Sequence, residues 1–483
     1  MLYPGQTILA TPEIKVLSQD QKEIIYNTAL DIMETAGVRV DHPEGRSLLL
    51  DNGARTGTND RIFIPSWLAQ KALSTVPPFF HLYNREGEQV MTVGGRHVNY
   101  CSQPDSGFID DLETGQRRPF VREDSKICGL ICDALPNIDM SSPSSMISDV
   151  PADIAYLIGH KDFMLNNTKP IMHGVLNPWQ VEQLAEMHTI ILGSREALAV
   201  RPVYLHFLMS ITPHIHTHEG IARLLTCAKY GIPVMAGGCT AGGSVGPATI
   251  AGNVAATIAE SLTSLVIGQL AKPGLPMVMG GVPSVTDMRS GIFCYGAPEL
   301  GLMVAAQSEV AQYLKIPCMG TAGCTDAVTF DEQATMEAYH SLWANTLSGA
   351  NIIHDIAFTE SANHASLELL AACDEMIGML KTFMKGIEIT PETLAVDVIK
   401  EVGPGNEYLS NSHTLKHCRE SYMPGVAVRQ TYDQWQAKGG KFYKERMREK
   451  LREIINTHKV PELSKEILAD LDELEKKWWQ SVS

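Results

Sequence analysis

Eight short apolar runs repeat one local pattern through the middle of the chain. Each run breaks into Gly, His, Ser or Thr and is followed by a stretch with helical spacing of apolar residues. The runs begin at His97, Ile138, Lys169, Arg201, Ile232, Leu275, Ile316 and Asn351. Because they are apolar throughout and do not alternate, they are typical of strands buried on both faces. Eight such units predict an α/β protein with an eight-fold β/α (TIM) barrel, whose function lies at the carboxyl ends of its strands.

The segments on either side of the predicted barrel have other patterns. Residues 1–95 combine helical stretches with an alternating, Gly-containing ribbon, and we expect them to pack on the barrel. The barrel with the active site is expected at residues 96–383. Residues 384–483 contain amphipathic and strongly charged helical stretches, which predict a helical C-terminal extension. No low-complexity linker separates the three segments, so we expect one compact unit.

Composition narrows the class of protein. Hydrophobic residues make up 44% and charged residues 19%, and the formal net charge is −16, which argues against nucleic-acid binding. No run of about 18 apolar residues predicts a membrane span. The first residues lack the basic and apolar regions of a secretory signal. The ten Cys are scattered through apolar stretches. We therefore expect reduced thiols and a cytoplasmic protein.

Histidines occur near several of the predicted strand ends. His173, His206 and His354 are the fifth, sixth and fourth residues of their apolar runs, so we expect them near one rim of the barrel. His214, His216 and His218 resemble a metal motif, although no partner carboxylate lies at a recognisable spacing. A metal-dependent hydrolase on the same barrel is therefore an alternative function. The motifs HExxH, CxxC and GxGxxG are all absent.

Two further features lie after predicted strands. Residues 237–253 are rich in Gly, which predicts either a tight loop over the barrel mouth or a surface that a flat partner approaches closely. Asp326 follows the seventh strand. Its carboxylate either faces a cationic ligand or caps the next helix, and the sequence leaves both interpretations open.

A set of ordered motifs resembles a known family. The motifs are PATIAGNVAATIAESL, GAPEL, TAGCTDA with DEQA, SGANIIHDIAF, and IKEVGPGNEYL with HTLKH. They resemble the trimethylamine methyltransferase family of corrinoid-dependent methyltransferases, over about residues 20–440. Founding members carry pyrrolysine at the end of strand seven, whereas this chain has ordinary residues there, with Cys324 and Thr325 near that position. The resemblance is therefore to the non-pyrrolysine branch.

That branch implies a reaction. Its members move a methyl group from a quaternary amine, such as glycine betaine, proline betaine, carnitine or γ-butyrobetaine, to Co(I) of a cognate corrinoid protein. A tertiary amine is released. The corrinoid (methylcobalamin when methylated) belongs to the partner, so we expect no tightly bound cofactor and no metal site. We also expect a homo-oligomer and no nucleic-acid or membrane partner. The identity of the betaine and of the partner is not readable from the sequence, and a trimethylamine methyltransferase is a second alternative.

The expected substrate suggests its own binding residues. A quaternary nitrogen has no N–H, so aromatic faces and a nearby carboxylate recognise it. We expect Tyr100 and Phe358 to cage the ammonium, with packing at the rim as the alternative. The resemblance implies that His354 contacts the substrate carboxylate. The remaining substrate-binding candidates are His206, Glu260, Arg289 and Asp326. Arg289 would pair with the carboxylate or be a surface charge, and Glu260 would bind substrate or serve packing.

Overall fold

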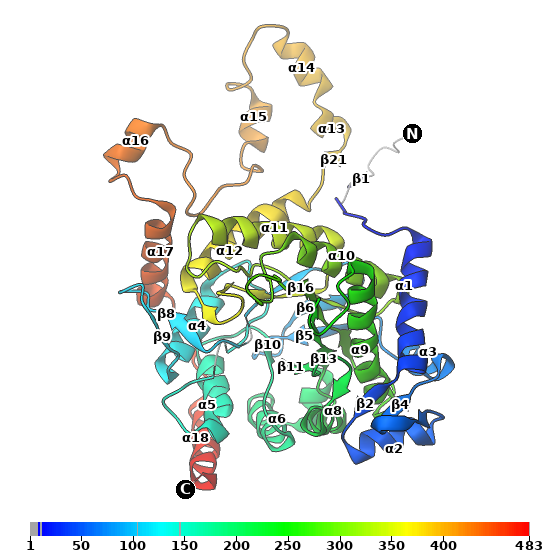
Figure 1. Ribbon diagram of the computed structural model, residues 1–483. Helices are drawn as coiled ribbons and strands as arrows, with labels where there is room; N and C mark the ends of the chain where they lie inside the picture. The colour runs from blue at the N-terminus through cyan, green and yellow to red at the C-terminus, as the bar shows by residue number, and fades with distance from the viewer. Residues whose placement is uncertain (1–7, 10–11, 104, 144–145, 483) are drawn as a thin grey trace.

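The eight apolar runs form a closed ring of parallel strands (Figure 1). The computed structural model describes all residues except 1–7, 10–11, 104, 144–145 and 483. Met140 and Ser141 occupy the second position of the ring and bridge to Cys101 and Ile171. The other positions are β7 (Asn99–Ser102), β10 (Ile171–His173), β11 (Tyr204–Met209), β13 (Val234–Gly237), β15 (Met277–Met279), β17 (Met319–Thr321) and β18 (Ile352–Ile356). Pairing of β18 with β7 closes the barrel, so the TIM-barrel prediction is confirmed.

A helix outside the ring follows each strand. These helices are α4 (Arg122–Ala134), α5 (Ala152–Leu165), α6 (Pro178–Leu192), α8 (His218–Tyr230), α9 (Ile250–Ala271), α10 (Pro298–Leu314), α11 (Glu332–Ser348) and α12 (Leu367–Phe383). Their ends follow local chemistry. The side chains of Asn177 and Thr217 accept backbone N–H groups at the starts of α6 and α8. Gly193 and Gly231 end the same two helices in the left-handed conformation that glycine adopts without strain.

One layer of apolar side chains fills the barrel, and a β-hairpin covers this layer at the amino-terminal ends of the strands. Each position of the ring contributes one residue to it: Cys101, Met140, Met172, Leu205, Met235, Val278, Met319 and Ile352. The hairpin of β5 (Phe79–Tyr83) and β6 (Gln89–Gly94) packs its apolar face, with Phe80 and Val93, against this layer. The hairpin seals the amino-terminal end of the barrel. Only the carboxyl ends of the strands are left to form a site.

The other N-terminal elements pack around the barrel helices. α1 and α3 lie against α9, and β2 pairs with β4 and with β12. These elements are α1 (Gln19–Asp31) with a π-helical turn (Ile32–Ala36), β2 (Val38–Val40), α2 (Pro43–Asp51), β3 (Arg55–Thr56), a 3₁₀ turn (Thr58–Asp60), β4 (Arg61–Phe63) and α3 (Ser66–Leu73). The first strand, β1 (Ile8–Leu9), pairs instead with β21 (Glu388–Ile389) of the C-terminal segment. The short inserted elements of the barrel are β8 (Phe108–Asp110), β9 (Arg117–Pro119), α7 (Arg195–Val200), β12 (Ile215–His216), β14 (Cys239–Gly242), β16 (Val282–Val285), β19 (Phe358–Thr359) and β20 (His364–Ala365).

The C-terminal segment returns to the barrel after leaving it. Its elements are β21 (Glu388–Ile389), α13 (Pro391–Leu394), α14 (Val396–Val402), α15 (Ser412–His417), α16 (Tyr432–Ala437), α17 (Tyr443–Thr457) and α18 (Lys465–Ser481). In Figure 1 the stretch from α13 to α16 projects away from the barrel, whereas α17 and α18 lie along it. The division of the chain at residues 95 and 383 stays a prediction.

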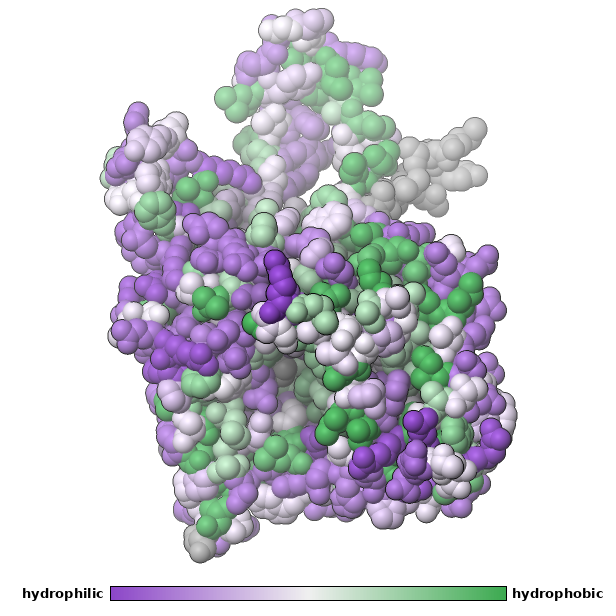
Figure 2. All heavy atoms as spheres, in the orientation of Figure 1, coloured by the Kyte–Doolittle hydropathy of each residue, from purple (hydrophilic) through white to green (hydrophobic). Residues whose placement is uncertain are grey.

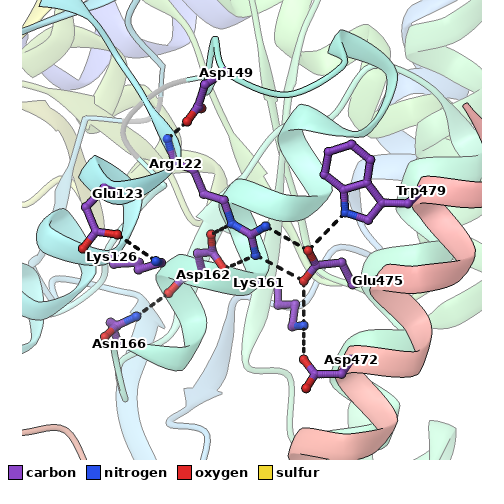
Figure 3. A network of polar contacts seen from close by, with 10 residues as sticks. All are labelled: Arg122, Glu123, Lys126, Asp149, Lys161, Asp162, Asn166, Asp472, Glu475 and Trp479. Atoms are coloured by element: carbon purple, nitrogen blue, oxygen red, sulfur yellow. Dashed lines mark hydrogen bonds and ion pairs between the residues drawn. The ribbon is translucent and has the colours of Figure 1, made fainter.

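Ion pairs fasten α18 to two barrel helices (Figure 3). Glu475 accepts hydrogen bonds from Arg122 on α4 at 2.9 Å and from Lys161 on α5 at 2.7 Å. Arg122 also pairs with Asp162, and Lys161 pairs with Asp472. The side chain of Lys161 is only 3% exposed, so its charge depends on these carboxylates.

Among the described residues, one helix is long and apolar enough to cross a membrane by composition. It is α9, and 83% of its most apolar window is buried inside the protein. That burial is what a core helix between a barrel wall and its outer helices shows.

Candidate active site at the barrel mouth

Four aromatic side chains gather at the carboxyl ends of the strands. Phe207 on β11 and Phe293 and Tyr295 in the loop after β16 are half-buried and pack over the apolar layer. The rings of Phe293 and Tyr295 are 5.0 Å apart, and the ring of Phe358 on β19 lies 6.4 Å from that of Tyr295. We call these four residues the aromatic cluster. Phe358 was predicted from the sequence, and the other three were not.

His354 and Asp355 lie beside the aromatic cluster. The His354 ring is 5.5 Å from the Phe207 ring, and its Nδ1 lies 2.6 Å from Oδ1 of Asp355. Both side chains are almost fully buried. The pairing of β18 with β7 shifts register between Ile353 and Ile356, and Asp355 has a φ of +70°, a conformation that Asp tolerates better than most residues. Asp355 interacts electrostatically with Tyr295. Burial raises the pKa of the Tyr295 hydroxyl, and the negative charge of Asp355 raises it as well.

The residues after β17 support the cluster from outside. Asp326 accepts backbone N–H groups of Tyr295 at 2.7 Å and Gly296 at 2.9 Å, and it accepts the Ser361 hydroxyl at 2.8 Å. Its carboxylate therefore joins three loops and does not cap a helix. Thr325 donates to Glu337 at 2.5 Å. Cys324 is buried, and burial raises the pKa of its thiol.

Glu260 holds a different loop of the mouth. Its carboxylate accepts the His214 backbone N–H at 3.0 Å and the Thr212 hydroxyl at 3.1 Å. A Cβ on Gly238 would come within 2.3 Å of the same carboxylate, so this position requires glycine. Burial raises the pKa of Glu260. Its contacts give it a positioning role for the loop after β11.

Tyr100 points away from the mouth, and this corrects its expected place in the ammonium cage. Side chains alternate along a barrel strand, and Cys101 faces the interior. Tyr100 therefore faces the outer helices. Its hydroxyl lies 2.9 Å from Oγ1 of Thr346 on α11, and Lys381 on α12 lies 5.4 Å from its ring centroid.

The same alternation corrects the expected position of His206. Leu205 and Phe207 face the barrel interior, so His206 faces outward, where its Nδ1 lies 2.6 Å from the Tyr204 hydroxyl. His173 also lies outside the wall, and its Nδ1 is 3.1 Å from Nδ1 of His160. Of the three histidines expected at one rim, only His354 reaches the mouth.

Arg289 faces solvent, which corrects its candidacy as a substrate ligand. Its side chain is 94% exposed and its ion-pair partner is Asp287 at 3.6 Å.

The histidines of the expected metal motif contact different partners. Nδ1 of His216 lies 3.2 Å from the Ser264 hydroxyl, and the His218 ring lies tilted against the His42 ring, with the ring centroids 4.6 Å apart. In the part of the chain that the structure describes, no group of three or more His, Cys, Asp and Glu is arranged to hold a metal ion.

The Gly-rich segment forms a short ribbon at the rim. β14 pairs in parallel with β16, and Gly242 bridges to Gly246. A Cβ at Gly246 would come within 2.3 Å of the Thr240 side chain. The Gly246 backbone therefore packs directly against that side chain, and the turn requires glycine there. The segment lies at the mouth, as one of the two sequence interpretations expected.

A cavity of about 230 Å³ opens beside the aromatic cluster. Phe207, Met209, Asp105, Tyr156 and Arg223 line it, together with Gly174, Val175 and Leu176. Figure 2 shows a hollow near the middle of this face with hydrophobic surface beside it, over α6 and α8. The cavity walls desolvate Asp105 and raise the pKa of its carboxyl to about 6, although the Tyr156 hydroxyl donates to it at 3.1 Å. No sequence motif marked these residues.

Comparison with known proteins decides the family. The family model described as trimethylamine methyltransferase (MTTB) matches residues 5–480. The chain belongs to the trimethylamine methyltransferase family. Members of this family are methyltransferases, and so is this protein. The metal-dependent hydrolase alternative has no support from these findings.

Two relatives and one solved structure illustrate the range of the family. The chain is 28% identical to the glycine betaine methyltransferase of Desulfitobacterium hafniense (strain Y51), covering 95% of this chain and 96% of that protein. It is 27% identical to the trimethylamine methyltransferase of Methanosarcina barkeri (strain Fusaro / DSM 804), covering 97% and 96%. The crystal structure of the Methanosarcina barkeri monomethylamine methyltransferase superposes with a TM-score of 0.53 at 13% identity, over 96% of this chain and 88% of that one. That likeness supports the fold.

Proposed function

We propose that this methyltransferase demethylates a quaternary amine of the betaine class and passes the methyl group to Co(I) of a partner corrinoid protein. The observation that carries the proposal is the aromatic cluster beside Asp355. Ring faces with one buried carboxylate match a cation that offers no N–H to hydrogen-bond. The similarity to a glycine betaine methyltransferase supports the same substrate class.

The reaction needs little from acid or base groups. The Co(I) electron pair forms the new bond to the methyl carbon, the C–N bond breaks, and its electron pair leaves with the amine as the tertiary product. A quaternary nitrogen is already a leaving group, so no proton is transferred. The residues at the mouth would therefore hold the methyl group in line with the approaching cobalt. Phe207, Tyr295 and Phe358 would orient the ammonium, and Asp355 would balance its charge.

The open face also suits a partner. Exposed apolar side chains stand on loops around the mouth, among them Leu176, Ile211, Val245, Met288 and Ile292. A flat corrin carried by another protein must reach the methyl group from this side, so we propose that the corrinoid protein docks here. None of the ten cysteines is bridged, which supports the proposed cytoplasmic location. The homo-oligomer stays a prediction.

A demethylation assay tests the proposed function. It contains the protein, a reduced corrinoid protein, and in turn glycine betaine, proline betaine, carnitine, γ-butyrobetaine and trimethylamine, with methyl-cobalt(III) absorbance as the readout. We expect a change with at least one betaine and none with trimethylamine. A change with trimethylamine alone would favour the trimethylamine alternative. No change with any compound, while a second enzyme methylates the same corrinoid protein, would refute the proposal.

A further inference from the structure

Arg223 is a half-buried arginine whose guanidinium has no carboxylate counter-ion among the described residues. It lies near the start of α8, and its Nε and Nη1 donate to the backbone carbonyls of Glu219 and Val175. It forms no ion pair with a carboxylate of the described residues. Other partly buried arginines behave differently, since Arg118 and Arg122 each pair with two carboxylates. A cation removed from water without an anion is costly, so the position calls for an anionic partner.

The surroundings of Arg223 indicate where that anion would lie. One wall of the cavity that it lines is apolar and consists of Phe207, Met209, Val175 and Leu176, whose side chains offer no hydrogen bonds; Asp105 and Tyr156 form a polar wall. Asp105 faces the same cavity but is bonded to Tyr156 and not to Arg223. Phe207 belongs both to this cavity and to the aromatic cluster beside His354. The cavity therefore joins a cationic group to the place proposed for the ammonium.

We propose that Arg223 binds the carboxylate of the substrate and thereby makes the enzyme selective for zwitterionic quaternary amines. The inference rests on the proposed function and deepens it. The ammonium would lie against Phe207 and the aromatic cluster, with the carboxylate directed to the guanidinium. A planar guanidinium suits a carboxylate because it donates two parallel hydrogen bonds. Carboxylate-free amines such as choline or tetramethylammonium would lose this contact.

The assignment differs from the role that the family resemblance implies for His354. An imidazole is neutral over much of the physiological pH range, whereas a guanidinium stays charged. His354 also already has Asp355 at 2.6 Å, so a second carboxylate beside it would be repelled. No carboxylate of the described residues lies within ion-pair distance of Arg223, and Asp105 in the same cavity is bonded to Tyr156. Variants of the two residues separate the two roles.

The experiment measures binding without any corrinoid protein. Isothermal titration calorimetry compares the wild type, Arg223→Met, Arg223→Lys and His354→Gln, with γ-butyrobetaine and glycine betaine as zwitterions and tetramethylammonium as the probe without carboxylate. Arg195→Met, a surface arginine, is the matched control. We expect Arg223→Met to weaken betaine binding roughly 10- to 100-fold while changing tetramethylammonium binding less than about two-fold. Arg223→Lys keeps the charge but not the paired donors, and its loss should be intermediate.

Each outcome decides between the hypotheses. If a folded Arg223→Met protein loses affinity for both ligand classes equally, or loses none, the proposal that Arg223 binds the substrate carboxylate is overturned. So does a selective loss of betaine binding in His354→Gln alone. If Arg223→Met does not fold, as judged by its melting curve, Arg223→Lys carries the test. If the wild type binds neither class and demethylates no betaine, the proposed function itself fails. If the wild type demethylates betaines and the Arg223 variants bind them with unchanged affinity, only the proposed role of Arg223 fails.

Discussion

The carboxylate of Asp326 accepts the backbone N–H of Tyr295 at 2.7 Å. A residue in the loop after one barrel strand, β17, thus fixes the backbone of an aromatic residue on another loop of the mouth. The same carboxylate accepts hydrogen bonds from the Gly296 backbone N–H and the Ser361 hydroxyl. The two loops that carry Tyr295 and Phe358 therefore share one acceptor. The geometry of the aromatic cluster depends on this carboxylate.

Replacement of Asp326 by Asn should therefore disturb the cluster. The amide keeps one acceptor but turns an NH₂ group toward a backbone N–H, which costs about 1–3 kcal/mol of stability. We expect kcat for the preferred betaine to fall roughly 10- to 100-fold, because the substrate is held out of line. Ser361→Ala removes one donor only and should lower kcat less than about three-fold. Equal activities of the two variants would contradict a positioning role for Asp326.

Tyr295 should contribute to ammonium binding through its ring. Tyr295→Phe keeps the π face and should change the Kd for tetramethylammonium less than about two-fold. Tyr295→Leu removes a cation–π contact of about 0.5–2 kcal/mol and should raise that Kd roughly 2- to 30-fold. Titration calorimetry measures both. A stronger effect of Phe than of Leu would mean that the hydroxyl, not the ring, recognises the ligand.

The histidines behind the barrel wall should make the protein acid-sensitive. Burial lowers the pKa of His173 and of His188 from 6.5 to about 3, and burial with the neighbouring imidazoles holds the pKa of His160 well below its ordinary value. Between pH 6.5 and 3 the unfolded chain binds more protons at these sites than the folded one. The free energy of unfolding should be unaffected by them above pH 6.5 and should fall below it, by about 1.4 kcal/mol per pH unit for each histidine.

Urea unfolding between pH 7.5 and 5.0 measures this slope. His188→Asn removes one buried imidazole and should flatten the slope, even if it lowers stability at pH 7.5. His218→Gln changes an exposed histidine and should leave the slope as it is. An unchanged slope in His188→Asn would mean that the acid sensitivity arises elsewhere.

Glu475 should hold α18 on the barrel. Burial raises the pKa of its carboxyl, but hydrogen bonds from Lys161 and Arg122 outweigh burial and keep it at about 2. Glu475→Gln should cost about 1–3 kcal/mol and expose the α18 amides to hydrogen exchange. The ordinary pKa is 4.5, so the wild-type contribution is complete above that pH and is lost as the pH falls toward 2.

Asp472→Asn is the control for this pair of contacts. Asp472 binds the same lysine, but its side chain is 66% exposed and its charge is screened by water. The loss should stay below about 1 kcal/mol. If both variants destabilise the protein equally, the burial of Glu475 is not the source of its effect.

Local pattern was enough to predict the barrel. Short runs that are apolar on both faces cannot be stable outside a covered parallel sheet, and eight of them with intervening helices have few arrangements. The same uniform hydrophobicity concealed which residues face inward. Tyr100 and His206 are each one position from an inward-facing residue, Cys101 and Phe207. When a strand is apolar on both faces, its sequence does not show which alternate residues point into the barrel. Both residues were therefore assigned to the wrong side of the barrel wall.

The candidate site depended on contacts that no local pattern shows. Phe293, Tyr295 and Arg223 lie on loops or helices whose sequences are unremarkable, and barrel closure brings them to Phe207 and His354. The bulge that turns Asp355 toward the mouth exists only where β18 meets β7. The sequence by itself determined the order of strands and helices and the family, because periodicity and motifs are local properties. Only the tertiary structure decided which side chains share the mouth, because that depends on strand register and ring closure between residues far apart in the chain.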